Sequence, residues 1–100
     1  MYTVNITFKV SHTVYDAWLA WMQETWIPML FPGDDKADHR LSRLLGHPDE
    51  DGATVVFQMF LPSRGFLNQY LEIRQQKLHK NISDKWGEHV LFFQTVLEEI

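Results

Sequence analysis

The chain of 100 residues contains no cysteine, which excludes disulfide bonds, thiolate chemistry and zinc sites with cysteine ligands. It has no apolar run near the ~20 residues needed to cross a bilayer. Its first residues also lack the basic region and long apolar stretch of a signal peptide. Because absent cysteine fits a reducing compartment, we expect a soluble, cytoplasmic protein with no membrane partner.

Positive charge is scarce as well. Lysine and arginine total 9 and aspartate and glutamate total 13, which gives a formal net charge of −4. A general nucleic-acid binder needs many cations on one face to neutralise phosphates, so we expect no nucleic-acid partner. The length, together with a hydrophobic fraction of 45%, predicts one globular domain over residues 1–100 with a two-layer core.

Three of the four tryptophans lie between Val14 and Pro28, in a stretch that predicts a helix capped by Ser11. Its apolar arc spans nearly half of the helix surface, whereas a stripe of about 100° suffices to cover a sheet. The residues of this arc are Val14, Ala17, Trp18, Trp21, Met22, Thr25 and Met29, extended by Tyr15, Leu19 and Trp26. We interpret it as a heavily packed core helix. The alternative is that its edge around Trp26 and Leu19 meets a ligand or another subunit. Pro28 should stop or kink the helix.

Four strands are predicted. Residues 2–10 alternate between apolar and polar side chains, which is typical of a strand with one buried face. After a loop over 31–38, a second strand from His39 or Arg40 to His47 and a third over 53–61 form a hairpin around the turn 48–52. The last strand, from His89 to about Leu97, is almost continuously apolar, which is typical of a central strand with both faces buried.

A second helix is expected between Ser63, as its cap, and Trp86, with Gly87 as its terminator. The order β-α-β-β-α-β predicts an α+β, ferredoxin-like fold with a four-stranded antiparallel sheet and two helices on one face. The other face is predicted to carry Asn5, Thr7, Lys9, Thr54, Val56, Gln58, Phe60, Val90, Phe92, Gln94 and Val96.

A bare sheet face of this composition would expose several hundred Å² of apolar surface, which is more than monomers usually show. The simplest cover is a second copy of the same sheet, related by two-fold symmetry. We therefore expect a homodimer through the open sheet face, in which the two sheets enclose a barrel.

Several segments carry a resemblance: Trp18-Leu-Ala-Trp21-Met22, Ile27-Pro28, Arg40 to Leu45, Pro62-Ser63, Tyr70-Leu71 and Val96-Leu97-Glu98. Over nearly the whole chain they resemble DUF4286, a family of uncharacterised bacterial proteins in the dimeric α+β barrel superfamily. In the family pattern a histidine commonly precedes Ile-Pro, whereas Trp26 stands there in this chain. The resemblance implies the barrel fold and no particular activity.

No specific catalytic motif is present. The histidines, at positions 12, 39, 47, 79 and 89, lack metal-ligand spacing, and we interpret them as exposed or loop residues. The acidic runs at 34–35 and 49–51 lack the alternating ligands and distant glutamate of a calcium loop. Neither a nucleophile elbow nor a glycine-rich phosphate loop occurs. We therefore predict no metal and no cofactor.

The remaining candidate site is the lining of the barrel. Its predicted residues are Asn5, Thr7, Arg43, Gln58, Phe92 and Gln94, with Trp18, Trp26 or Tyr70 near a mouth. These groups either satisfy one another across the dimer, as buried polar groups must, or hydrogen-bond a small organic ligand in an apolar pocket. Related barrel families resemble the second case, since they hold flat organic substrates among aromatic and amide side chains.

Two functions follow. The first is a homodimeric barrel protein that binds a small molecule or serves as a structural or interaction module. The alternative is a cofactor-free monooxygenase or isomerase acting on an aromatic or polyketide-like substrate. An RNA-recognition sheet shares the strand order, but this chain lacks the basic surface that such a sheet needs.

Overall fold

The computed structural model describes residues 1–31, 37–46 and 52–100. Its elements are, in chain order, β1 (Tyr2–Val10), a short helical turn (His12–Val14), α1 (Tyr15–Trp21), a wide turn (Met22–Trp26), α2 (Ile27–Leu30), β2 (Asp38–Arg43), β3 (Ala53–Leu61), α3 (Arg64–Gln69), a second wide turn (Tyr70–Arg74), α4 (Gln75–Trp86), a short helical turn (Gly87–His89) and β4 (Val90–Glu98). The predicted order β-α-β-β-α-β is confirmed.

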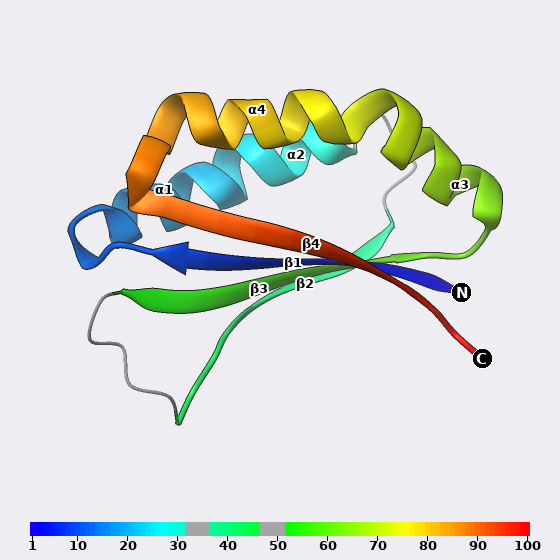
Figure 1. The fold of residues 1–100 in the computed structure, drawn as a ribbon, viewed down its shortest axis with the longest axis horizontal. Coiled ribbons are helices and arrows are strands. Elements are labelled where there is room, and N and C mark those ends of the chain that lie inside the picture. The colour runs from blue at the N-terminus through cyan, green and yellow to red at the C-terminus, as the bar shows by residue number, and fades with distance from the viewer. Residues whose placement is uncertain (32–36, 47–51) are drawn as a thin grey trace.

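The strands form one antiparallel sheet in the order β2-β3-β1-β4. Both helical segments lie on the same side of this sheet (Figure 1). The fold is therefore α+β and ferredoxin-like, the arrangement that the dimeric α+β barrels share. The sheet face opposite the helices is not covered by any described part of the chain.

β4 lies at an edge of the sheet, so the prediction of a central strand is wrong. Each helical connection carries the chain over one intervening strand, which makes β1 and β3 the central pair. One side of β4 packs beneath the helices. On its other side Leu91, Phe93 and Leu97 are more than half exposed. The apolar run thus combines one core side with one exposed apolar side.

The first helical segment buries residues that are spaced four apart, namely Trp18, Met22, Trp26 and Leu30. In a regular α-helix a spacing of four drifts by about 40° at each step. The wide turn corrects this drift, because the Ile27 N–H bonds to the Met22 carbonyl oxygen, five residues back. The stripe therefore stays over the sheet along the whole segment.

The predicted apolar arc of this helix is wrong in part, because it assumed a regular pitch. Ala17, Thr25 and Met29 fall within that arc and are exposed. Trp26 is fully buried inside its own chain, which rules out the alternative that it faces a ligand or subunit. The pitch changes directly before Pro28, as a kink would require, and the helix continues to Leu30.

The predicted helix caps differ in outcome. The Ser63 hydroxyl accepts a hydrogen bond from the Phe66 N–H at 3.3 Å, which confirms its role as a cap. Ser11 makes no side-chain cap hydrogen bond, so that prediction is wrong. Gly87 follows α4 with a positive φ of 55°, as expected of a terminator.

The loop and hairpin predictions are tested only in part. β3 matches its prediction at both ends, whereas β2 ends at Arg43, before the predicted His47. The loop residues 32–36, His47 and the turn residues 48–51 lie outside the described residues. Gly52, at the end of the predicted turn, has the expected positive φ, at 146°.

Candidate functional site

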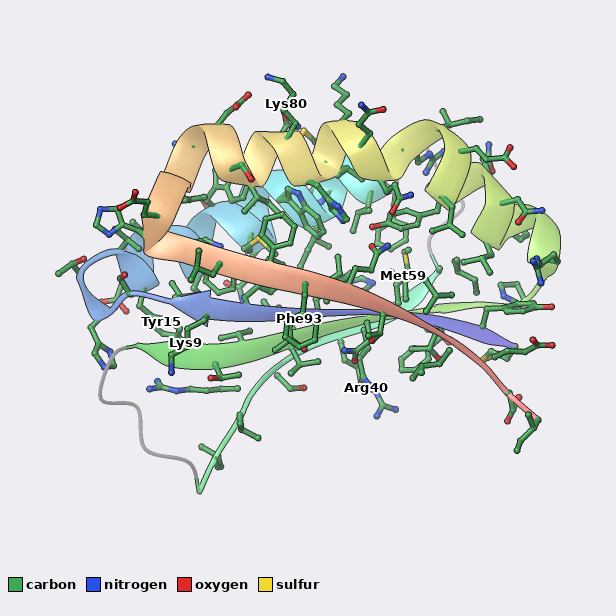
Figure 2. All side chains as sticks on the ribbon, viewed as in Figure 1. Lys9, Tyr15, Arg40, Met59, Lys80 and Phe93 are labelled. Carbon is green, nitrogen blue, oxygen red and sulfur yellow. The ribbon has the colours of Figure 1, made fainter. Side chains whose placement is uncertain are left out.

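The open face is the sheet surface opposite the helices. Asn5, Thr7 and Gln58 lie on it as predicted, because they alternate with buried neighbours that face the helices. The Asn5 amide donates to the Thr7 hydroxyl at 3.5 Å. Figure 2 shows Lys9 and Arg40 on this side of the sheet and Met59 on the helix side. By strand register the open face comprises Thr3, Asn5, Thr7, Lys9, Asp38, Arg40, Ser42, Thr54, Val56, Gln58, Phe60, Leu91, Phe93, Thr95 and Leu97.

The predicted face of β4 is wrong. Phe92 pairs across from Phe8, and Gln94 pairs across from Ile6. Cross-strand partners share a face, and Phe8 and Ile6 are buried beneath the helices, so Phe92 and Gln94 point to the helix side. The same register moves Val90 and Val96 to that side. Alternation could not reveal this, because β4 is apolar on both sides.

Three other predicted site residues also lie away from the open face. Trp18 and Trp26 are fully buried in the core, where the Trp26 indole N–H donates to the Leu78 carbonyl oxygen at 3.1 Å. Arg43 is in the helix-facing register of β2, and its guanidinium carbon lies 5.0 Å from the centroid of the Tyr15 ring. The nine predicted site residues therefore do not form one site.

Gln94 is the centre of a hydrogen-bond network between β4 and the second helical segment. The Tyr70 hydroxyl donates to Gln94 Oε1 at 2.7 Å, and His79 Nε2 lies 3.2 Å from the same oxygen. Gln94 Nε2 donates to Gln75 Oε1 at 2.8 Å, and Gln75 Nε2 donates to the Leu71 carbonyl oxygen at 2.9 Å. Because an amide oxygen only accepts, His79 donates from Nε2.

The two ionisable members of this network are held neutral. Burial raises the pKa of Tyr70 well above its ordinary value. Burial also lowers the pKa of His79, and the hydrogen bond to Gln94 opposes that shift in part. At neutral pH Tyr70 is therefore a hydroxyl and His79 is an uncharged imidazole, so the network carries no net charge.

A cleft of about 740 Å³ opens at one end of the helix–sheet sandwich. The end of α2, the start of β2, the end of β3 and the region from α3 into the second wide turn all contribute to its walls. Its buried lining includes Met59, Leu61 and Tyr70. The ring of Phe31 also lines it and stacks on His39, with centroids 5.1 Å apart and an interplanar angle of 28°.

Two residues of the second helical segment complete the cleft. Phe66 lines it with 49% of its surface exposed. Arg74 is half-buried, and its Nη1 donates to the Leu30 carbonyl oxygen at 2.7 Å, at the last residue of α2. That bond satisfies a carbonyl at a helix end, where intrahelical partners run out. It also fixes the guanidinium at the cleft wall.

Of the residues that line the cleft, sequence reasoning singled out Tyr70 alone as a site residue. A signal for two more was present, because Phe66, Tyr70 and Arg74 are spaced four apart. The wide turn Tyr70–Arg74 keeps such a row on one side of the segment, as the first wide turn does for the tryptophan row. Phe31 and His39 gave no comparable signal, because only the tertiary fold brings them together.

The DUF4286 family model, described as "Domain of unknown function", matches residues 1–100. The chain belongs to the DUF4286 family. In this DUF4286 protein Trp26 lies in the core, where its indole N–H is bonded to the Leu78 carbonyl oxygen. No curated protein sequence matches the chain.

Two solved structures resemble this DUF4286 protein in fold. One is a protein of the ethyl tert-butyl ether D (EthD) family from Bacillus halodurans, with a TM-score of 0.70, 18% sequence identity and coverage of 100% of both chains. The other is PelD from Pseudomonas aeruginosa, with a TM-score of 0.53, 16% identity and coverage of 98% of this chain and 32% of that chain. At these identities the likeness supports the fold and leaves the activity open.

Over residues 1–31, 37–46 and 52–100, no three histidine, cysteine, aspartate or glutamate side chains cluster as metal ligands would. No helix in this part of the chain is both long and apolar enough to span a bilayer.

Proposed function

We propose that this DUF4286 protein is a homodimeric small-molecule-binding module that holds a flat organic molecule in the cleft of each subunit. The cleft carries the proposal. Its volume of about 740 Å³ falls within the roughly 300–1,000 Å³ of typical ligand sites. Its lining, which combines apolar side chains with a few polar ones such as Arg74 and Gln69, is also typical of such sites. The cysteine-free sequence suits action in a reducing compartment such as the cytoplasm.

The proposed pairing of two chains rests on the composition of the open face. On the open face Leu91, Phe93 and Leu97 stand more than half exposed along one strand. The charged residues of this face, Lys9, Asp38 and Arg40, lie at a strand end or on the edge strand β2. The rest of the face carries the apolar residues Val56 and Phe60 and uncharged polar side chains. The polar side chains can pair across a two-fold axis without burying charge.

The size of the open face also suits a second copy. Three strands of nine residues and one of six, about 4.8 Å apart and rising ~3.3 Å per residue, give a footprint of roughly 500 Å². Specific interfaces bury about 800 Å² per partner. Side chains that protrude from the sheet add accessible area to the flat footprint, so sheet-on-sheet packing reaches this range. A second copy of this chain is therefore the occupant that we propose for the open face.

A blocked cleft tests the binding proposal. Gln69 lines the cleft and Glu72 does not, and both are exposed on the second helical segment. Saturation-transfer NMR against a library of small aromatic compounds should detect binders to the wild-type protein. Gln69→Trp should weaken them at least about tenfold by filling the mouth, and the matched Glu72→Trp should leave them unchanged. If no compound binds, or if both variants bind as the wild type does, the proposal fails.

A second candidate, a cofactor-free enzyme of the dimeric-barrel type, has one observation in its favour. Tyr70 lines the cleft and connects through Gln94 to His79. Such a network can position a phenol, whose hydroxyl would donate to the Tyr70 oxygen. Because burial raises the pKa of Tyr70, its hydroxyl would act as a hydrogen-bonding group and not as a base. Oxygen uptake or isomerisation of a bound aromatic compound, lost in Tyr70→Phe, would favour this candidate.

A further inference from the structure

We infer that the ligand of the cleft is a flat aromatic carboxylate whose anionic group pairs with Arg74 and whose ring lies between Phe31 and Phe66. This inference rests on the proposed binding function and deepens it, because it names the chemical class of the ligand. Three features support it: an oriented guanidinium, an excess of positive charge in the cleft, and an aromatic surface left open beside that charge.

Arg74 is oriented and has donors to spare. A guanidinium carries five N–H donors, and one of them is held by the Leu30 carbonyl oxygen at 2.7 Å. In the described part of the chain no carboxylate forms an ion pair with Arg74. A half-buried guanidinium among apolar walls favours an anionic partner, and its planar fork matches both oxygens of a carboxylate. The bond to Leu30 holds the fork in place before a ligand arrives.

The described side chains of the cleft carry a net positive charge, opposite in sign to that of the chain. The chain carries a net charge of −4. Among the described side chains of the cleft, however, Arg40 and Arg74 are cationic and Asp38 is the one acid. Asp38 and Arg40 lie in the open-face register of β2, which leaves Arg74 as the charge on the helix side. An anion that enters between α2 and the second helical segment therefore meets Arg74 without an adjacent carboxylate from the described chain.

Aromatic side chains line the same cleft as Arg74. Phe66 keeps 49% of its surface exposed at the cleft, which leaves an uncovered ring. Phe31 is buried and forms a fixed wall of the cleft, because its ring stacks on His39. The Tyr70 hydroxyl donates its hydrogen bond to Gln94, so Tyr70 does not compete with Arg74 as a donor to the anion. A ligand ring gains area burial and aromatic contacts there.

The test compares two probes that differ only in charge, 2-naphthoate and its neutral analogue 2-naphthamide, by isothermal titration calorimetry. The wild-type protein should prefer the carboxylate by about 10- to 100-fold, as charge-assisted hydrogen bonds do. Arg74→Gln should abolish this preference while leaving the affinity for the amide nearly unchanged. The matched control is Arg64→Gln, which removes an arginine of the same helical segment that does not line the cleft. It should keep the full preference.

Arg74→Gln also removes a bond to a helix end, so folding is checked by circular dichroism and thermal melting. If it does not fold, Arg74→Lys keeps the charge but loses the fork, and its preference should fall to an intermediate value. Equal wild-type affinity for the two probes would overturn the carboxylate inference and leave the proposed binding function intact. A preference that falls equally in Arg64→Gln would overturn the assignment to Arg74. Failure of all aromatic compounds to bind would instead overturn the binding function.

Discussion

Phe93→Asp should separate the proposed dimer. Phe93 is 61% exposed in the single chain and sits on the outer side of β4 within the open face. An aromatic side chain buries about 200 Å² when fully covered, so pairing would cover roughly 120 Å² more of each Phe93. At ~25 cal/mol per Å² this is about 3 kcal/mol per copy and about 6 kcal/mol per dimer. Loss of that burial weakens association by about 10⁴-fold.

Sedimentation velocity at micromolar concentrations measures this effect. The wild-type protein should sediment at twice the monomer mass of 11.9 kDa, and Phe93→Asp should sediment as a monomer with unchanged circular dichroism. The matched control is Ile73→Asp, since Ile73 is 69% exposed but lies on the helix side of the sheet. It should remain dimeric. A dimeric Phe93→Asp, or a monomeric Ile73→Asp, would refute the assignment of the open face as the interface.

Three further predictions concern stability. Because burial lowers the pKa of His79 below its unfolded value of about 6.5, the unfolded chain binds a proton that the folded chain does not. The free energy of unfolding should therefore fall as the pH drops through that value. Thermal melts of His79→Gln should lack this part of the pH dependence. Identical pH profiles for the wild type and His79→Gln would contradict this prediction. Trp26→Phe should lower the free energy of unfolding, measured in urea, by about 2–4 kcal/mol, because it leaves a gap in the core and removes the hydrogen bond to the Leu78 carbonyl oxygen in α4. A loss below about 1 kcal/mol would contradict the observed packing of Trp26. Gly52→Ala should cost more than about 2 kcal/mol, because the new methyl group collides with the Val10 carbonyl oxygen at a positive φ. Gly46→Ala, where φ is also positive but space is open, is the control and should cost less.

The positions of β1 and β3 were predictable because each alternates between apolar and polar residues. This alternation predicts which side of the strand is buried, so Asn5, Thr7 and Gln58 were placed correctly on the open face. β4 was placed one residue out of phase because both of its sides are apolar. Its register with β1 decides the matter and puts Phe92 within 5.9 Å of the Phe8 ring on the helix side. Phe92→Asp therefore tests the core, and Phe93→Asp tests the pairing.

The helices illustrate a different limit. A period of 3.6 residues predicts which side of a regular helix is buried, but both helical segments contain a wide turn that resets the phase. Rows spaced by four, such as Trp18 to Leu30, were visible in the sequence and carried this information. The row Phe66, Tyr70 and Arg74 was visible in the same way, but the cleft was not predictable, because Phe31 and His39 join that row only in the folded chain.

Native mass spectrometry of the wild-type protein with 2-naphthoate tests the central claim, a paired module with one cleft per subunit, most directly. The prediction is a dimer of twice 11.9 kDa that takes up two molecules of the probe. A monomer at micromolar concentrations would contradict the pairing through the open face. A dimer that takes up no probe, and no other aromatic compound, would contradict the binding function of the cleft.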